Sequence, residues 1–189
     1  MANPTLRIML AGEPGIGKTS IVARLQDLTG MDAAILDVPG MDLGDIAMPV
    51  IDHETRTTRY YPNARFGFHT GQPMIICLDE YTKGATPIKN MLHPLLEQFR
   101  PRLGDVLVPT GAWPNGQGEG SLLFLTGNNE TDGVGDSLQG HTRQRVLVCE
   151  VRKPSYEIWR RWADANNAHP IIKAWADQFQ YAFASYTDG

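Results

Sequence analysis

The stretch GEPGIGKTS, from Gly12 to Ser20, directly follows an apolar run and decides the fold. It has the form G-x-x-x-x-G-K-[ST], in which glycines let the backbone wrap a phosphate and inward-pointing N–H groups form an anion nest. The apolar run before it predicts a strand, so a Gly-rich surface turn is the weaker interpretation. The residues predicted to bind the phosphates of a nucleotide are Gly12, Glu13, Pro14, Gly15, Ile16, Gly17, Lys18, Thr19 and Ser20.

Two side chains of this loop have specific predicted roles. Lys18 reaches the β and γ phosphates as a point charge, and the Thr19 hydroxyl ligates Mg²⁺. A helix is predicted over residues 18–29, and its N-terminus adds the positive end of the helix dipole. The pattern therefore predicts a nucleoside triphosphate and Mg²⁺ as the ligands.

A second segment, PMIICLDE at residues 73–80, strengthens this prediction. Its four apolar residues, 75–78, fit a strand that is buried on both faces. Asp79 and Glu80 then emerge at the carboxyl end of the strand, where open α/β sheets bind ligands. Asp79 is predicted to hold Mg²⁺, and Glu80 to polarise the water that attacks the γ phosphate.

Composition limits the class of protein. The chain has 189 residues, which is enough for one α/β domain and a small appendage. Its net charge is −4, which argues against a general coat for nucleic acid. The two cysteines, Cys77 and Cys149, fall in predicted strands and are expected to be core residues rather than a disulfide or metal site. There is no leader-like or membrane-spanning apolar run, so a cytoplasmic protein is expected.

The rest of the chain alternates strand and helix signals up to Lys153-Pro154. Further strands are predicted over 5–11, 33–38, 122–126 and 146–151, a short helical segment over 41–51, a loop or hairpin over 53–70, a helix over 87–100, and a hairpin or loop over 104–120. Five strands interleaved with helices predict a three-layer α/β/α sandwich around a five-stranded parallel sheet, the fold of P-loop NTPases. We place a domain boundary at residue 153.

Two amphipathic helices are predicted beyond the boundary, over 155–165 and 170–185. This piece holds three of the four tryptophans, and its aromatic stripe is expected to pack in a core.

Two further positions are candidates for catalysis. Asn128 follows the strand at 122–126 and is placed to orient the attacking water or contact the γ phosphate, although Asn129 leaves a one-residue ambiguity. Residues 141–161 carry six of the 17 basic residues against two acids. A charge run is usually a solvated face, but an arginine here can also reach the γ phosphate of a neighbouring subunit as an arginine finger.

Taken in order, these elements resemble the AAA+ ATPases, and within them the MoxR-like branch, especially members encoded by phages and prophages. The resemblance covers residues 6–170 and rests on GEPGIGKT as Walker A, MIICLDE as Walker B and LFLTGN as sensor 1, with LDVPGMDLGDI, DGVGDSLQGHTRQRV and EIWRRWA followed by HP. It implies a nucleotide-binding domain over 1–153 and the incomplete start of a helical lid over 154–189. Arg145 best matches the finger position and Arg143 is the alternative, while Gln144 departs from the Asn or Asp that the family often has there.

The resemblance implies a ring, usually of six subunits, that hydrolyses ATP at the subunit interfaces and remodels a partner protein as a motor or chaperone. It also implies a von Willebrand factor A-type partner, and a bacterial host cytoplasm if the chain is phage-encoded. Two alternatives stay open: a DNA-handling ATPase, which the acidic pI of about 5.7 disfavours, and a nucleotide switch with little turnover. A GTPase is disfavoured because NETD at residues 129–132 does not match NKxD.

Overall fold

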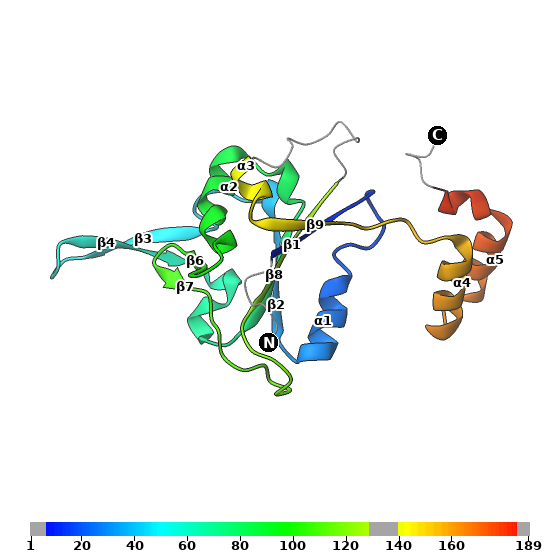
Figure 1. The fold of residues 1–189 in the computed structure, drawn as a ribbon, viewed down its shortest axis with the longest axis horizontal. Coiled ribbons are helices and arrows are strands. Elements are labelled where there is room, and N and C mark those ends of the chain that lie inside the picture. The colour runs from blue at the N-terminus through cyan, green and yellow to red at the C-terminus, as the bar shows by residue number, and fades with distance from the viewer. Residues whose placement is uncertain (1–6, 129–139, 185–189) are drawn as a thin grey trace.

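The computed structural model describes residues 7–128 and 140–184, and its centre is a five-stranded parallel sheet in the order β2-β5-β8-β1-β9 (Figure 1). The predicted α/β fold with a five-stranded parallel sheet is confirmed. Each strand lies within about two residues of its predicted bounds. These strands are β1 (Arg7–Ala11), β2 (Asp32–Asp37), β5 (Met74–Asp79), β8 (Leu122–Gly127) and β9 (Val146–Glu150).

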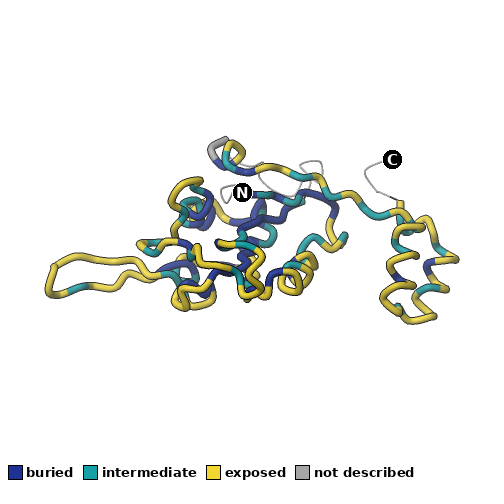
Figure 2. Tube along the Cα trace, turned by 60° about the horizontal axis from the view of Figure 1, so that its bottom comes forward, coloured by how far each residue is buried: buried dark blue, intermediate teal, exposed yellow. Residues whose placement is uncertain are grey.

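The sheet is covered on both faces, because side chains of its central strands alternate between two apolar clusters. Ile75 and Cys77 point to the face that α1 (Ile21–Thr29) covers, with Val22. Ile76 and Leu78 point to the opposite face, where they belong to one cluster with residues of α2 (Thr86–Leu92) and of the 3₁₀ helix η5 (His93–Leu96). In Figure 2 the buried residues gather in the middle of the molecule, whereas the long projecting hairpin and the helices at the other end are mostly exposed. The continuous apolar run of β5 thus reflects burial on both sides.

The helix predicted over residues 87–100 is shorter than expected. α2 ends at Leu92, and Pro94 lies in the 3₁₀ turn η5 that follows it. Proline lacks the N–H that an α-helix needs and clashes with the preceding turn, so the helix cannot continue through it. As a result Phe99, predicted on the buried face of the helix, is 90% exposed.

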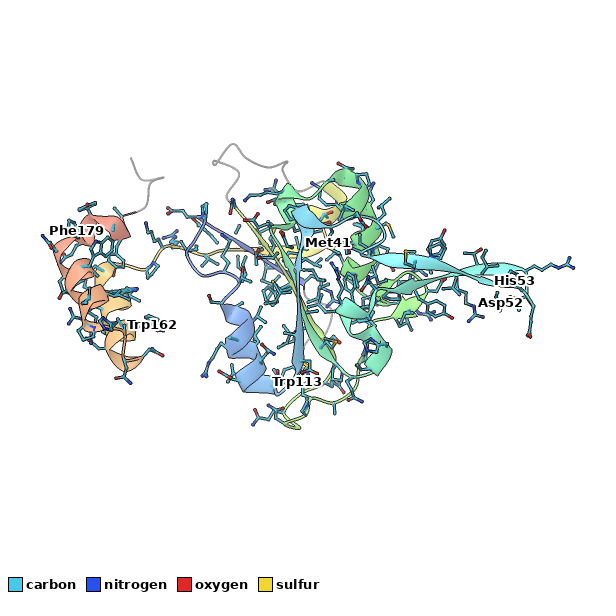
Figure 3. All side chains as sticks on the ribbon, turned by 180° about the vertical axis from the view of Figure 1, so that it is seen from behind. Met41, Asp52, His53, Trp113, Trp162 and Phe179 are labelled. Carbon is cyan, nitrogen blue, oxygen red and sulfur yellow. The ribbon has the colours of Figure 1, made fainter. Side chains whose placement is uncertain are left out.

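A β-hairpin extends away from the sheet, built from β3 (Ala47–Asp52) and β4 (Thr57–Pro62). The hairpin expected after residue 53 therefore starts earlier, and the helical segment predicted over 41–51 is wrong: residues 43–46 form a bend and a turn, and β3 begins at Ala47. The tip lies at Asp52 and His53, far from the sheet (Figure 3). Its base is fixed to the turn between the short strands β6 (Arg102–Leu103) and β7 (Val106–Leu107): the Tyr60 N–H donates to Asp105 Oδ2 at 2.8 Å.

The strand β9 forms one edge of the sheet, after the short helix α3 (Gly140–Arg143). It was predicted as a core strand, but Leu147 is 50% exposed and Cys149 is only half-buried. Cys77 is buried as predicted, and burial, followed by the nearby charge of Asp79, raises the pKa of its thiol to about 12. Cys77 therefore stays protonated near neutral pH, as expected of a core cysteine.

The last described elements are α4 (Tyr156–Ala165), α5 (Pro170–Gln178) and the 3₁₀ helix η7 (Gln180–Phe183), which lie to one side of the sheet (Figure 1). α5 is shorter than predicted. The Ser155 hydroxyl caps α4 by accepting from the Ile158 N–H. The expected core packing of the aromatic stripe is wrong in part, because Trp162 is 57% and Trp175 51% exposed. No helix within 7–128 and 140–184 is long and apolar enough to span a bilayer.

The two-sided burial of β5 predicts its contribution to stability. Replacing Ile76, which is fully buried, with Ala should lower the free energy of unfolding by about 2–5 kcal/mol, because it removes buried methylenes and leaves a cavity. Ile35→Ala is the matched control on the edge strand β2, where the side chain is 52% exposed, and should cost about 1 kcal/mol or less. Urea denaturation monitored by circular dichroism measures both, and equal losses would contradict this account of the core.

Candidate nucleotide-binding site

The predicted phosphate loop leaves β1 at Ala11 and leads into α1 at the carboxyl edge of the sheet. Gly17 has φ 91°, a left-handed conformation that side chains with a Cβ avoid. Gly12 is also required, because a Cβ there would lie 2.3 Å from the Val151 carbonyl oxygen. The helix begins at Ile21 rather than at Lys18, since tight turns occupy the intervening residues: the Ser20 N–H donates to the Gly17 carbonyl at 3.0 Å.

A cavity of about 290 Å³ opens beside this loop, between the ends of β1, β5 and β8. Most of the predicted site residues line it together. The lining consists of Pro14, Gly15, Gly17, Lys18, Thr19, Ser20, Asp79, Glu80, Thr126, Gly127 and Asn128. Three predicted loop residues, Gly12, Glu13 and Ile16, are not part of this lining. Segments from three strands, distant in sequence, therefore meet where the loop pattern predicted phosphate binding.

The Lys18 ammonium lies between the loop and β8. Its Nζ donates to the carbonyl oxygens of Gly12 at 2.9 Å and Glu13 at 2.8 Å, and lies 3.5 Å from Asn128 Oδ1. Gly12 and Glu13 thus orient Lys18 through their backbones. The ammonium and the Asn128 amide are brought together at one end of the cavity, as their predicted roles require.

Thr19 and Asp79, the two predicted magnesium ligands, are in direct contact. The Thr19 hydroxyl donates to Asp79 Oδ1 at 2.8 Å, across 60 residues of sequence. Mg²⁺ is usually held by one or two protein oxygens, with waters and phosphate oxygens completing its octahedron. The described residues contain no group of three or more His, Cys, Asp or Glu side chains that could hold a metal ion. This pair of oxygens therefore fits Mg²⁺ that arrives with a nucleotide better than a tightly bound structural metal.

Glu80 lines the cavity in an unusual backbone conformation. Its φ is 50° and its ψ 35°, in the left-handed region. Its carboxylate accepts from Lys83 Nζ at 2.9 Å, in a partly exposed ion pair. Glu80 is thus adjacent to the pocket, with its carboxylate partnered by Lys83.

Two residues that the sequence analysis did not single out, Lys83 and Thr126, contact these acids. Thr126 is 1% exposed and its hydroxyl lies between Asp79 and Glu80. The available signal was a polar residue near the end of an otherwise apolar strand, LLFLTG. Lys83 follows Glu80 by three residues, a spacing that predicts contact between two side chains only in a regular helix.

Arg145 and Arg143 lie away from the cavity. Arg145 precedes β9, whose first residue, Val146, pairs with Arg7, while its last, Glu150, pairs with Ala11 at the start of the loop. A strand of five residues is roughly 16 Å long, so Arg145 lies at the amino ends of the strands, opposite the carboxyl ends where the phosphate loop lies. Its Nη1 lies 3.0 Å from Nδ1 of His93. Arg143 is exposed.

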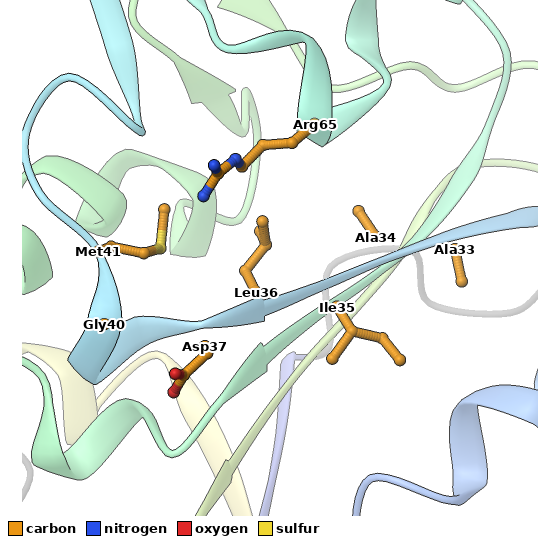
Figure 4. A pocket seen from close by; sticks show the side chains of 8 residues that line it. All are labelled: Ala33, Ala34, Ile35, Leu36, Asp37, Gly40, Met41 and Arg65. Carbon is orange, nitrogen blue, oxygen red and sulfur yellow. The ribbon is translucent and has the colours of Figure 1, made fainter.

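A second cavity, of about 430 Å³, runs along the outer edge of β2 (Figure 4). Leu36 points to the same side as Met41 and Arg65, whereas Ile35 points to the opposite side of the strand. None of the predicted nucleotide-binding residues lines this cavity. It is larger than the cavity at the loop but carries none of the predicted phosphate chemistry.

Residues 7–146 match the family model of the AAA domain, dynein-related subfamily. The chain belongs to this AAA family. The matched region runs from β1 to the first residue of β9 and so contains the phosphate loop, Asp79, Glu80 and Asn128. Nucleotide binding by an AAA-family ATPase domain follows from this membership.

The fold is also shared with solved structures. The crystal structure of a "putative ATPase" from Cytophaga hutchinsonii ATCC 33406 is 16% identical and superposes with a TM-score of 0.56. The match covers 88% of the present chain but only 48% of the Cytophaga chain, so the present chain spans about half the length of that protein. At this identity the likeness concerns the fold alone. No curated protein matches the chain.

Nucleotide affinity should depend on Lys18. Lys18→Ala removes the ammonium from a partly buried loop, and losing one partner of such a charged contact costs about 2 kcal/mol or more, which is at least about 30-fold in affinity. Lys153→Ala is the matched control, because its Nζ donates to the Ala184 carbonyl and it does not line the cavity. Calorimetric titration with ATP and Mg²⁺ measures both variants, and unchanged affinity in Lys18→Ala would rule out the phosphate-loop assignment.

Proposed function

We propose that this AAA domain hydrolyses ATP with Mg²⁺. The observation that carries the proposal is the convergence of Lys18, Thr19, Asp79, Glu80 and Asn128 on one cavity at the carboxyl edge of the sheet. Adjacent acids after a buried strand would be unremarkable alone. Opposite a phosphate loop, they supply a metal ligand and a base, and a phosphate transferase has no evident need for the second acid.

Each side chain has a distinct task. Lys18 places a positive charge on the β and γ phosphates, and Thr19 and Asp79 present oxygens to the metal. Mg²⁺, when bound, neutralises charge that develops on the phosphate oxygens. Glu80 accepts a proton from the attacking water, and Asn128 orients that water or contacts the γ phosphate. Lys83 binds one oxygen of the Glu80 carboxylate, Oε2, so Oε1 is the oxygen that accepts the proton of the water.

Glu80 and Asp79 should be separable by mutation. Glu80→Gln keeps the shape of the side chain but removes the base, so ATP should bind normally while kcat falls by ~10²–10⁴-fold. Asp79→Asn should instead weaken the Mg²⁺-dependent part of ATP binding, because it removes a charged ligand. Phosphate release and calorimetry with and without Mg²⁺ measure the two effects.

The control for charge loss alone is Glu54→Gln, at the exposed tip of the β3–β4 hairpin, which should leave kcat unchanged. Equal and mild effects of the Glu80 and Asp79 variants would show that neither acid has its proposed role.

The finer role follows from the resemblance to the MoxR-like branch and its phage-encoded members. On that basis residues 154–189 are the start of a helical lid, and the protein forms a ring of six that remodels a partner, such as a von Willebrand factor A-type protein, in the bacterial cytoplasm. The position of Arg145 and Arg143 supports a shared site. Both lie at the amino ends of the strands, opposite the phosphate loop, so neither can contact a nucleotide bound to its own subunit. Either can face the nucleotide of a neighbouring subunit.

A DNA-handling role is less well supported. Two of the six basic side chains between 141 and 161 are bound to carboxylates: Arg152 to Glu150 at 3.7 Å, and Arg160 to Asp164 at 3.2 Å and also to Asp177. Such pairing leaves less positive charge for phosphate contacts. Salt-dependent DNA binding would be the sign of that alternative.

Activity should depend on assembly. Arg145→Ala and Arg143→Ala are expected to bind ATP almost normally, and the variant that lacks the finger should hydrolyse it poorly. Mixed with Lys18→Ala, that variant should recover turnover, because the Lys18→Ala chain still supplies its arginine to the neighbour's ATP. Steady-state phosphate release across protein concentrations and mixing ratios makes the measurement.

The Lys18→Ala chain alone is the blank for these mixtures. Specific activity that is independent of concentration, with no recovery in any mixture, would favour a monomeric ATPase and remove the ring from the proposal.

A further inference from the structure

Thr126 occupies a buried position between the two acids of the site. It lies in β8, one residue past Leu125, and Leu125 pairs with Leu78 of β5. This register sets Thr126 beside Asp79 at the ends of neighbouring strands. Its side chain is nearly inaccessible, at 1% exposure. A buried hydroxyl is favourable only when it is hydrogen-bonded, so its partners decide what it does.

The Thr126 hydroxyl makes two hydrogen bonds whose directions are fixed. The backbone N–H of Glu80 can only donate, so Thr126 Oγ1 accepts from it, at 3.0 Å. The hydroxyl hydrogen is then left for the carboxylate, and Oγ1 donates to Asp79 Oδ1 at 2.5 Å. One side chain therefore links the carboxylate of Asp79 to the backbone of Glu80.

On the Asp79 side, this bond acts together with Thr19. Both hydroxyls donate to the same oxygen, Oδ1, from opposite segments of the site. Two donors on one oxygen restrict rotation of the carboxylate about its terminal bond. Groups that orient a metal ligand in this way commonly change metal affinity or activity 10- to 100-fold when removed, by the order of magnitude known from other metal sites.

On the Glu80 side, the bond supports the left-handed backbone. A residue with a Cβ is disfavoured at φ 50° and persists there only where its surroundings hold it. The Glu80 N–H is fixed by Thr126, and its carbonyl accepts from the Lys83 N–H at 2.9 Å. This conformation directs the chain sharply away from β5 while Glu80 still lines the cavity.

We infer that Thr126 is a positioning residue for the ATPase reaction, which sets the orientation of the metal ligand Asp79 and the backbone of the base Glu80 through one hydroxyl. The inference rests on the proposed function. The inference goes beyond the proposed function because it assigns a role to a residue that does not contact the nucleotide phosphates in that mechanism.

The chain provides a matched control in Thr82. This threonine is 9% exposed, and a Cβ on Gly127 would lie 3.1 Å from its Oγ1, so it neighbours the same strand end. Within the described residues, its buried hydroxyl has no hydrogen-bond partner. Thr82→Val thus removes a buried threonine hydroxyl close to the site without breaking a hydrogen bond.

The test compares Thr126→Val, which keeps the branched shape, with Thr126→Ser, which keeps the hydroxyl, and with Thr82→Val. We expect Thr126→Val to lower kcat about 10- to 100-fold, to raise the Mg²⁺ concentration for half-maximal turnover, and to leave KM for ATP within a few-fold. Thr126→Ser should restore kcat to within a few-fold of the wild type, and Thr82→Val should match the wild type. Thermal melting identifies any variant that is not folded, and Thr126→Ala replaces Thr126→Val if the latter does not fold.

A second readout requires no hydrolysis: the gain in ADP affinity that Mg²⁺ produces, measured by calorimetry. Thr126→Val should reduce this gain relative to the wild type and Thr82→Val. If the wild type shows no turnover, the proposed ATPase function fails, and the Mg²⁺-dependent gain alone decides the role of Thr126. The inference would be overturned if folded Thr126→Val, or Thr126→Ala in its place, kept both the wild-type kcat and the wild-type Mg²⁺-dependent gain in ADP affinity. It would also be overturned if Thr126→Ser were no more active than Thr126→Val.

Discussion

The parallel register of β1, β5 and β8 is the constraint on which the site depends. Ala11 pairs with Gly127, and Leu78 pairs with Leu125, so the three strands end within one or two residues of each other at the same edge. The phosphate loop, the two acids and Asn128 each follow one of these ends. Side chains alternate between faces along a strand, so a slip of one residue in β5 would send Asp79 to the opposite face from Thr19. The apolar clusters on both faces of the sheet oppose such a slip, and in this way the core fixes the geometry of the site.

The parts of the fold that depend on local patterns could be predicted from the sequence. The buried strands are short, continuous apolar runs, and the phosphate loop has a spacing that few other structures require. Because loop and acids must each follow a strand, the order of the motifs along the chain also predicted which side chains converge. The contacts of Lys18 with Asn128, and of Thr19 with Asp79, agree with that expectation.

Predictions failed where a segment's environment, rather than its pattern, decides the outcome. Helical periodicity in residues 87–100 continued past Pro94, but the backbone could not. The stripe that includes Trp162 and Trp175 has the spacing of a buried face, yet periodicity does not say what covers it, and half of each side chain is exposed. The β3 strand contains Pro49, which lowers its strand signal, and the hairpin tolerates that residue because, among the described residues, β3 pairs with β4 alone and is therefore an edge strand.

Thr126 was missed for a different reason, and it shows how the site holds a disfavoured conformation. The residue has no local signal because its role arises from pairing with β5, 46 residues away. Glu80 must leave β5 at its last residue and still face the cavity, which calls for a left-handed turn that its own side chain disfavours. A neighbouring strand can hold such a turn only if one of its side chains reaches the exposed N–H, and a serine or threonine hydroxyl can do this while also donating to a carboxylate. Local preference is thus overridden at the residue proposed to act as the base, and the hydrogen bonds that override it come from β8 and from the turn that ends at Lys83.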